Sequence, residues 1–143
     1  MKKEVLITIK GTQLQDGEKD EVELFTTGNY YRRGNSYFIA YDESEATGFQ
    51  GSLTIVKVED GLKRVTLNRT GTTKSQLIVE RGVRHQCNYD TGYGNFTIGV
   101  LGDRICSTLN ENGGELEFGY SLDINASLAS ENTVAISIRQ PEC

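Results

Sequence analysis

The sequence has no tryptophan, a single proline and a single histidine among its 143 residues. Any metal site would therefore have to add cysteine or carboxylate ligands to His85, and zinc needs three or four ligands. A Ser-His-Asp or Cys-His arrangement would require a nucleophile to meet that one ring in space, and no spacing in the chain indicates such a meeting. We predict no metal and no cofactor, and the pattern assigns no catalytic residue.

Cysteine is also sparse, and long hydrophobic runs are missing. The three cysteines, Cys87, Cys106 and Cys143, are odd in number and widely spaced, which favours reduced thiols over a disulfide framework. The apolar stretch 5–9 is broken by Thr8 and is much shorter than the core of a secretory signal. No run approaches the ~20 apolar residues of a membrane-spanning helix. These features predict a cytoplasmic protein with no membrane partner.

Phosphate-binding loops are absent as well. The segment GYG at 92–94 is followed by NFT, which breaks the dinucleotide fingerprint, and no Walker-type lysine follows a glycine. Glu115 and Glu117 would lie about 6.5 Å apart along a strand, a spacing compatible with glycosidic acid/base chemistry. The same alternation is typical of a solvent-facing strand, and we favour that interpretation.

What the chain has instead is glycine and strict alternation of apolar residues. The alternation is strongest over 115–126 and recurs at 5–9 and 134–138, so both ends of the chain are predicted to be paired strands. Asp60-Gly61 separates two alternating runs and predicts a tight hairpin. Most of the sixteen glycines fall between such runs, at the spacing expected of sandwiches and barrels.

No segment has sustained helical periodicity, and only a short helical turn at 42–47 is suggested. A chain of this length fits one domain. Short connections favour a meander, and paired terminal strands favour closure. We therefore predict a single all-β domain over 1–143, an antiparallel up-and-down β-barrel of about 8–10 strands.

The net charge of -5 is unevenly distributed along the chain. Residues 61–104 contain 7 Lys/Arg and 3 Asp/Glu, whereas the segments on either side are acidic. One hypothesis is that this basic region, through Lys63, Arg64 and Arg84, docks RNA or a protein partner. The acidic pI of about 4.9 makes nucleic acid the less favoured partner, and the charges also fit the outer face of hairpins. An exposed edge strand would allow a homodimer.

A second hypothesis places a small ligand at one end of the barrel. Arg69 ends a predicted strand, and Tyr89, Thr91 and Tyr120 are polar residues whose parity would turn them inward or toward the mouth. A buried arginine needs partners, and with a tyrosine hydroxyl it would orient an anionic ligand. The alternative is that Arg69 binds backbone carbonyls at a corner. We predict a small polar or amphipathic ligand.

Four segments, in this order, also resemble a known family. They are VLITIKGTQ at 5–13, the RTG at 69–71 before SQL at 75–77, the YDT at 89–91 before Gly94, and EFGYSL at 117–122 before Asn132 and the last strand. Together they are similar to the YwiB-like family of small uncharacterised bacterial proteins. This resemblance extends over nearly the whole chain and implies a calycin-type, lipocalin-like barrel. It implies no activity, because the function of that family is unknown.

Overall fold

The computed structural model describes residues 2–43, 51–59, 61, 64–71, 74–90, 95–124 and 127–141. Ten strands form in these ranges. They are β1 (Lys2–Gln15), β2 (Glu18–Arg33), β3 (Ser36–Asp42), β4 (Ser52–Glu59), β5 (Arg64–Gly71), β6 (Lys74–Glu80), β7 (Arg84–Asp90), β8 (Asn95–Ser107), β9 (Gly114–Ile124) and β10 (Ser127–Arg139). Within the same ranges, no helix is long and apolar enough to cross a membrane.

The strands form one closed antiparallel sheet. Each strand pairs with its neighbours in sequence, and β1 also pairs with β10, which completes the ring. Ile7 lies opposite Ile138 on one side and Thr26 on the other, so the two terminal strands are joined well inside their length. The predicted all-β, up-and-down antiparallel barrel is confirmed.

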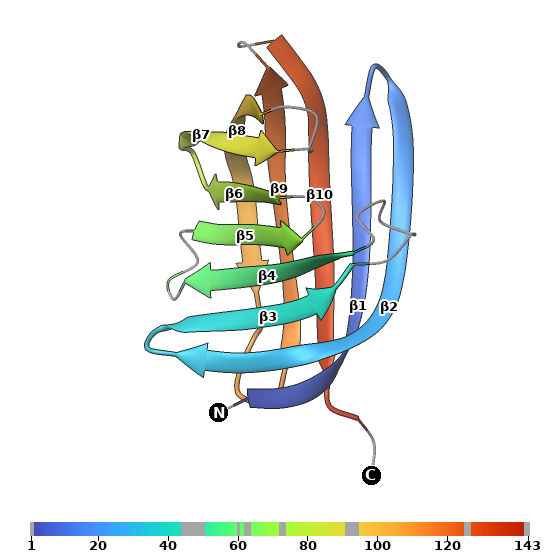
Figure 1. Cartoon of the computed structure of the whole chain (residues 1–143), viewed down its shortest axis with the longest axis vertical. Coiled ribbons are helices and arrows are strands. Elements are labelled where there is room, and N and C mark those ends of the chain that lie inside the picture. Colours follow the sequence, from blue (N-terminus) through green and yellow to red (C-terminus); the bar gives the residue numbers. More distant parts are fainter. Residues whose placement is uncertain are drawn as a thin grey trace.

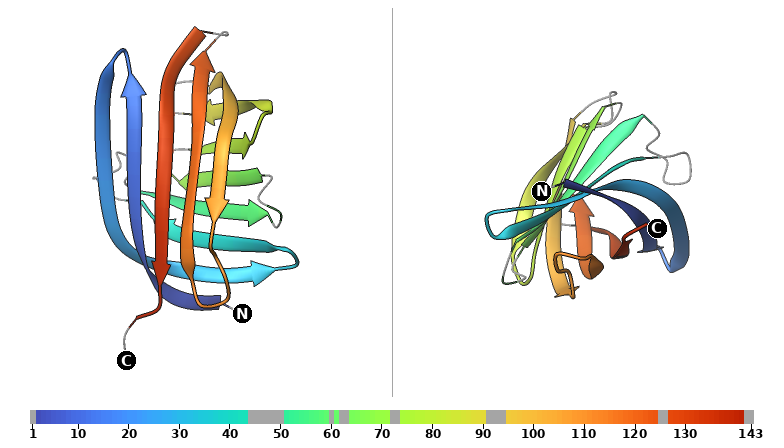
Figure 2. Two further views of the ribbon diagram at one scale, coloured as in Figure 1. Left: turned by 180° about the vertical axis from the view of Figure 1, so that it is seen from behind. Right: turned by 90° about the horizontal axis from the view of Figure 1, so that it is seen from below.

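The barrel is flattened into two layers whose strands cross (Figure 1). The short strands β3 to β7 lie across the long strands β1, β8, β9 and β10, and the view from behind shows the long strands in front of the short ones (Figure 2). Strand β2 belongs to both layers, because it pairs with β1 along most of its length and with β3 over 28–33. Crossed layers of this kind enclose an interior that need not be equally filled at every point.

Tight turns explain how far the first two strands extend. Asp16 and Gly17 have φ values of 52° and 78°, the positive values that a two-residue hairpin turn needs. This turn lets β1 and β2 continue far beyond the alternation at 5–9. The extension of the two strands was not predicted from the sequence. Gly61, in the predicted hairpin, has φ 85°. Most of the helical turn suggested at 42–47 lies outside the described residues.

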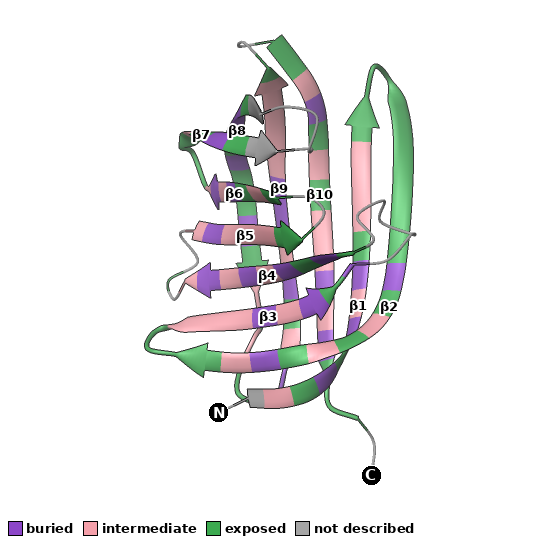
Figure 3. Cartoon of the chain, in the orientation of Figure 1, coloured by how far each residue is buried: buried purple, intermediate pink, exposed green. Residues whose placement is uncertain are grey.

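Buried side chains occur on every strand, and they are most frequent on the short strands and on the ends of β1, β9 and β10 nearest the chain termini (Figure 3). Val5, Ile39, Val56, Val65 and Phe118 are fully buried there. By contrast, the ends of β1 and β2 near their shared hairpin are half-buried or exposed. The densely packed half stabilises the fold, and the interior of the other half is less completely filled by side chains.

Candidate functional site

The less densely filled half of the barrel contains a cavity of about 640 Å³. It lies between the inner faces of the two layers, and its rim includes the exposed Asp20 of β2 and Ile124 of β9. Its lining is mostly apolar, with a few polar groups. The lining residues are Ile9, Gly11, Thr12, Gln13, Asp20, Val22, Leu24, Tyr41, Glu43, Leu67, Arg69, Leu77, Ile98, Tyr120, Leu122, Ile124, Asn132, Thr133 and Val134.

Strand parity brings these side chains inward. On β5, Val65 is fully buried, and Leu67 and Arg69 follow on the same face until the strand reaches the cavity. On β9, the fully buried Phe118 is followed on the same face by Tyr120, which lines the cavity. Each strand thus passes from packed core to cavity wall along one continuous face.

A cluster of polar side chains lies at the wall formed by β3, β4 and β5. The Thr54 hydroxyl donates to Glu43 Oε1 at 2.7 Å, and Arg69 Nε donates to Thr54 Oγ1 at 3.3 Å. Arg69 Nη2 also lies 3.5 Å from Glu43 Oε1. The Glu43 side chain is only 1% exposed and that of Arg69 14%, so this ion pair is largely removed from water. Such a buried ion pair is tolerated because the attraction between the two charges offsets the cost of removing them from water.

Register places these groups side by side. Thr54 lies opposite Tyr41 of β3 and opposite Arg69 of β5, so the three residues form one row across the layer. Glu43 follows directly after β3, and its N–H donates to the carbonyl of Ser52 at 2.8 Å. The carboxylate therefore has a fixed position next to the row.

Two tyrosine hydroxyls complete the polar wall. Burial, and then the nearby charge of Glu43, raise the pKa of Tyr41 well above its ordinary value, while Arg69 acts in the opposite direction. Burial also raises the pKa of Tyr120, again opposed by Arg69. Both hydroxyls are therefore neutral well beyond pH 7, and that of Tyr41 is hydrogen-bonded to Glu43 and Thr54.

Two of the four predicted ligand-site residues, Arg69 and Tyr120, line the same cavity. Tyr89 lies on β7, opposite Ser75 of β6, and its side chain lies outside the described residues. Thr91 lies outside them altogether. Arg69 contacts the side-chain oxygens of Glu43 and Thr54, rather than serving only backbone carbonyls at a corner as the alternative supposed.

Tyr41, Glu43 and Thr54 belong to the polar wall and were not predicted from the sequence. The alternation of apolar residues already indicated that Glu43 and Thr54 face inward. Ile39 and Tyr41 are buried on β3, and Glu43 continues their spacing; Thr54 similarly precedes the fully buried Val56 by two residues. Extending the inward face past the last apolar residue would have found them.

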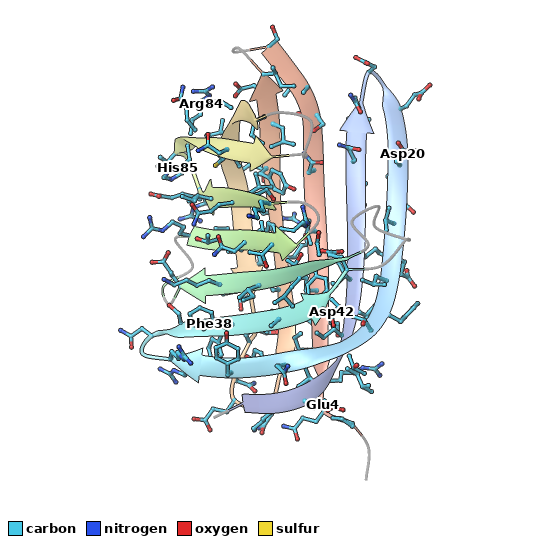
Figure 4. The ribbon with its side chains drawn as sticks, viewed as in Figure 1. Glu4, Asp20, Phe38, Asp42, Arg84 and His85 are labelled. Carbon is cyan, nitrogen blue, oxygen red and sulfur yellow. The ribbon has the colours of Figure 1, made fainter. Side chains whose placement is uncertain are left out.

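Two of the three predicted basic docking residues, Arg64 and Arg84, are described, and both form ion pairs. Arg64 donates to the Glu59 carboxylate at 2.5 and 3.1 Å. Arg84 donates to that of Asp123 at 2.9 and 2.6 Å. Lys63 lies outside the described residues. Figure 4 places Arg84 at the opposite end of the short strands from Asp42. Docking through 61–104 stays a prediction.

Other chemistry-bearing residues have ordinary partners. His85 Nε2 lies 2.9 Å from Glu80 Oε1. The Cys87 thiol is buried, which raises its pKa, and it accepts the N–H of Ile78 at 3.5 Å. Glu117 forms an ion pair with Arg104 on the outer surface. In the part of the chain that the structure describes, no three His, Cys, Asp or Glu side chains are grouped to hold a metal ion.

The fold and the cavity define the chain as a small up-and-down β-barrel with a partly polar interior. The chain belongs to the family described as "Domain of unknown function (DUF1934)", whose model matches residues 7–136. It is 29% identical over 126 residues to the "Uncharacterized beta-barrel protein YwiB" of Bacillus subtilis (strain 168), covering 87% of this chain and 86% of that protein. The expected YwiB-like resemblance is therefore confirmed.

A solved structure shares the fold. The crystal structure of the ywiB protein from Bacillus subtilis matches with a TM-score of 0.86 at 22% sequence identity, covering 99% of this chain and 94% of that one. The barrel fold of this chain is thus shared with the ywiB protein.

Proposed function

We propose that the protein is a non-catalytic, lipocalin-like cytoplasmic barrel that binds a small polar or amphipathic ligand in its cavity. The observation that carries the proposal is one apolar cavity with a polar cluster at its wall, formed by Glu43, Arg69, Tyr41 and Tyr120. Its volume of about 640 Å³ lies within the range of roughly 300–1,000 Å³ common for small-molecule sites.

The shape of the barrel supports this proposal over a purely structural role. Barrels of about eight strands can be filled completely by their own side chains. This barrel has ten strands, and its cavity wall includes Gly11, which has no side chain and whose added Cβ would meet nothing within 4 Å. A mainly apolar lining with a few fixed polar groups is the usual composition of a ligand site.

Native mass spectrometry tests the proposal. Untagged protein is purified from its own host and its native mass is compared with the denatured mass of the same sample. We expect a small-molecule adduct that is released on denaturation and is lost in Tyr120→Phe. It should persist in Glu23→Gln, a matched control at an exposed ion pair with Lys10.

A bare mass would contradict the ligand proposal. An adduct of nucleic acid or a protein partner would favour the alternative, docking through 61–104. That alternative predicts binding that weakens steeply with salt and with Arg64→Glu or Arg84→Glu, because the attraction would come from released counterions. The two functions therefore have different signatures in one sample.

A further inference from the structure

We infer that the cavity selects an uncharged amphiphile, with an alcohol- or amide-like head at the Glu43–Arg69 cluster and an aliphatic body along the apolar wall. This inference rests on the proposed function and names the chemical class of its ligand. It revises the anionic ligand that Arg69 suggested in the sequence, because the structure supplies the counter-charge from the protein itself.

The charges of the lining argue against an anion. Among the described lining residues, the charged ones are Asp20, Glu43 and Arg69, two negative and one positive. Arg69 already faces Glu43 at 3.5 Å, so a ligand carboxylate approaching the guanidinium would also approach that carboxylate. The ligand carboxylate would lose its hydration beside an ion pair whose charges already cancel, so electrostatic attraction would offset little of the desolvation free energy.

The same wall argues against a cationic head. Glu43 Oε1 accepts from Thr54 and contacts Arg69, and its side chain is almost completely buried. An ammonium group would reach this carboxylate only by standing next to the Arg69 guanidinium, which repels it. Asp20 is the other acidic lining residue, but it is exposed at the rim, where water and salt screen its charge.

An uncharged head satisfies the wall without these costs. A hydroxyl or amide both donates and accepts hydrogen bonds, and it carries no net charge to desolvate. The Tyr120 hydroxyl is neutral and lines the same cavity, so it offers the head a donor, whereas the Tyr41 hydroxyl is already hydrogen-bonded to Glu43 and Thr54. Leu24, Leu67 and Leu122, from three different strands, provide the apolar surface for an aliphatic chain.

A series of ligands that differ only in the head group tests the inference. The full chain, refolded from denaturant to remove any co-purified ligand, is titrated by isothermal calorimetry near neutral pH with decanol, decanoate and decylamine. The shared chain keeps the apolar contribution constant. We expect decanol to bind about tenfold or more tightly than either charged analogue, because each ion must be desolvated beside a neutralised pair.

A charge variant sharpens the test. Glu43→Gln leaves the Arg69 charge without its carboxylate partner, so decanoate affinity should rise about tenfold or more while decanol affinity changes little. Glu23→Gln removes an exposed carboxylate and should leave all three affinities as they were. If Glu43→Gln does not fold, the double variant Glu43→Gln/Arg69→Met, which buries no lone charge, should still prefer decanol.

The failures are distinguishable. If decanoate binds most tightly to the unmodified protein, the uncharged-head inference is overturned while the proposed binding function stands. If decylamine binds most tightly, the same conclusion follows. If none of the three binds, the proposed function fails for amphiphilic ligands and the inference fails with it.

Discussion

The two halves of the barrel are made from the same strands and have different contents. On β9, Leu116 and Phe118 are 1% and 0% exposed, whereas Tyr120 and Leu122, next on the same face, are half-buried and line the cavity. The alternation of apolar residues is uninterrupted across this change. Alternation therefore decides which side chains face inward, and the shape of the layers decides whether they meet.

The packed half is also closed by specific contacts. The Tyr30 hydroxyl donates to the carbonyl of Asn110 at 2.7 Å, and Lys3 Nζ donates to that of Glu111 at 3.0 Å. Tyr30 also stacks on Tyr37 with ring centroids 5.5 Å apart. These contacts join β1, β2 and β3 to the β8–β9 connection. None of the residues that make them lines the cavity.

Two leucines on β9 should differ most in stability. Leu116→Ala leaves a void in the packed half and should lower the free energy of unfolding by about 2–5 kcal/mol. Leu122→Ala trims a wall that already borders open space and should cost about 1 kcal/mol or less. Urea unfolding of both variants measures the difference. Equal costs would mean that the cavity half is filled in solution.

The next effect is expected at the polar cluster. Arg69→Met leaves the Glu43 carboxylate buried without its cation, which should cost about 3 kcal/mol. Adding Glu43→Gln removes the lone charge and should recover most of the loss. A thermodynamic cycle from urea unfolding measures the coupling. Purely additive costs would show that the two side chains do not interact.

Two glycines extend the comparison to the backbone. In Gly28→Ala, the new Cβ would collide with the carbonyl oxygen of Ala40 and with Ile7, so we expect a loss of about 1–3 kcal/mol. In Gly11→Ala, the Cβ would meet nothing within 4 Å, and a gain of roughly 0.5 kcal/mol is expected because alanine is less flexible in the unfolded chain. Thermal unfolding of both proteins checks the opposite signs.

The smallest expected effect is a pH dependence. The pKa of Tyr41 is raised above its ordinary value of 10.0 in the folded protein, so the unfolded chain releases this proton first as the pH rises. The corresponding stability is complete below pH 10 and is lost above it. Tyr41→Phe should lose less stability than the unmodified protein between neutral pH and pH values above 10. Identical losses, measured by urea midpoints, would place this hydroxyl in water.

Most of the fold was predictable from local patterns. The alternation over 115–126 marked β9, the runs at 5–9 and 134–138 marked the paired terminal strands, and Gly61 marked a hairpin. The full length of β1 and β2 was not predicted. The parts of these strands next to the Asp16-Gly17 turn carry polar residues on both faces, and that turn was not recognised as a hairpin.

The site was predictable only in part. Arg69 and Tyr120 could be chosen because each continues an inward face past its apolar residues. The partner of Arg69 depends on the register that aligns Tyr41, Thr54 and Arg69 across three strands. That register depends on the length of each connection as well as on the alternation, and of the two connections between these strands only the one between β4 and β5 carries a hairpin signal in the sequence, at Asp60-Gly61.

Methyl NMR of selectively labelled protein titrated with decanol tests most directly whether one half of the barrel is a ligand cavity. We predict chemical-shift changes at the methyl groups of Leu67, Leu77 and Leu122, while Leu116 and Val56 in the packed half stay unchanged. Changes confined to exposed leucines of the outer surface, such as Leu6 and Leu128, or no changes at all, would contradict the account.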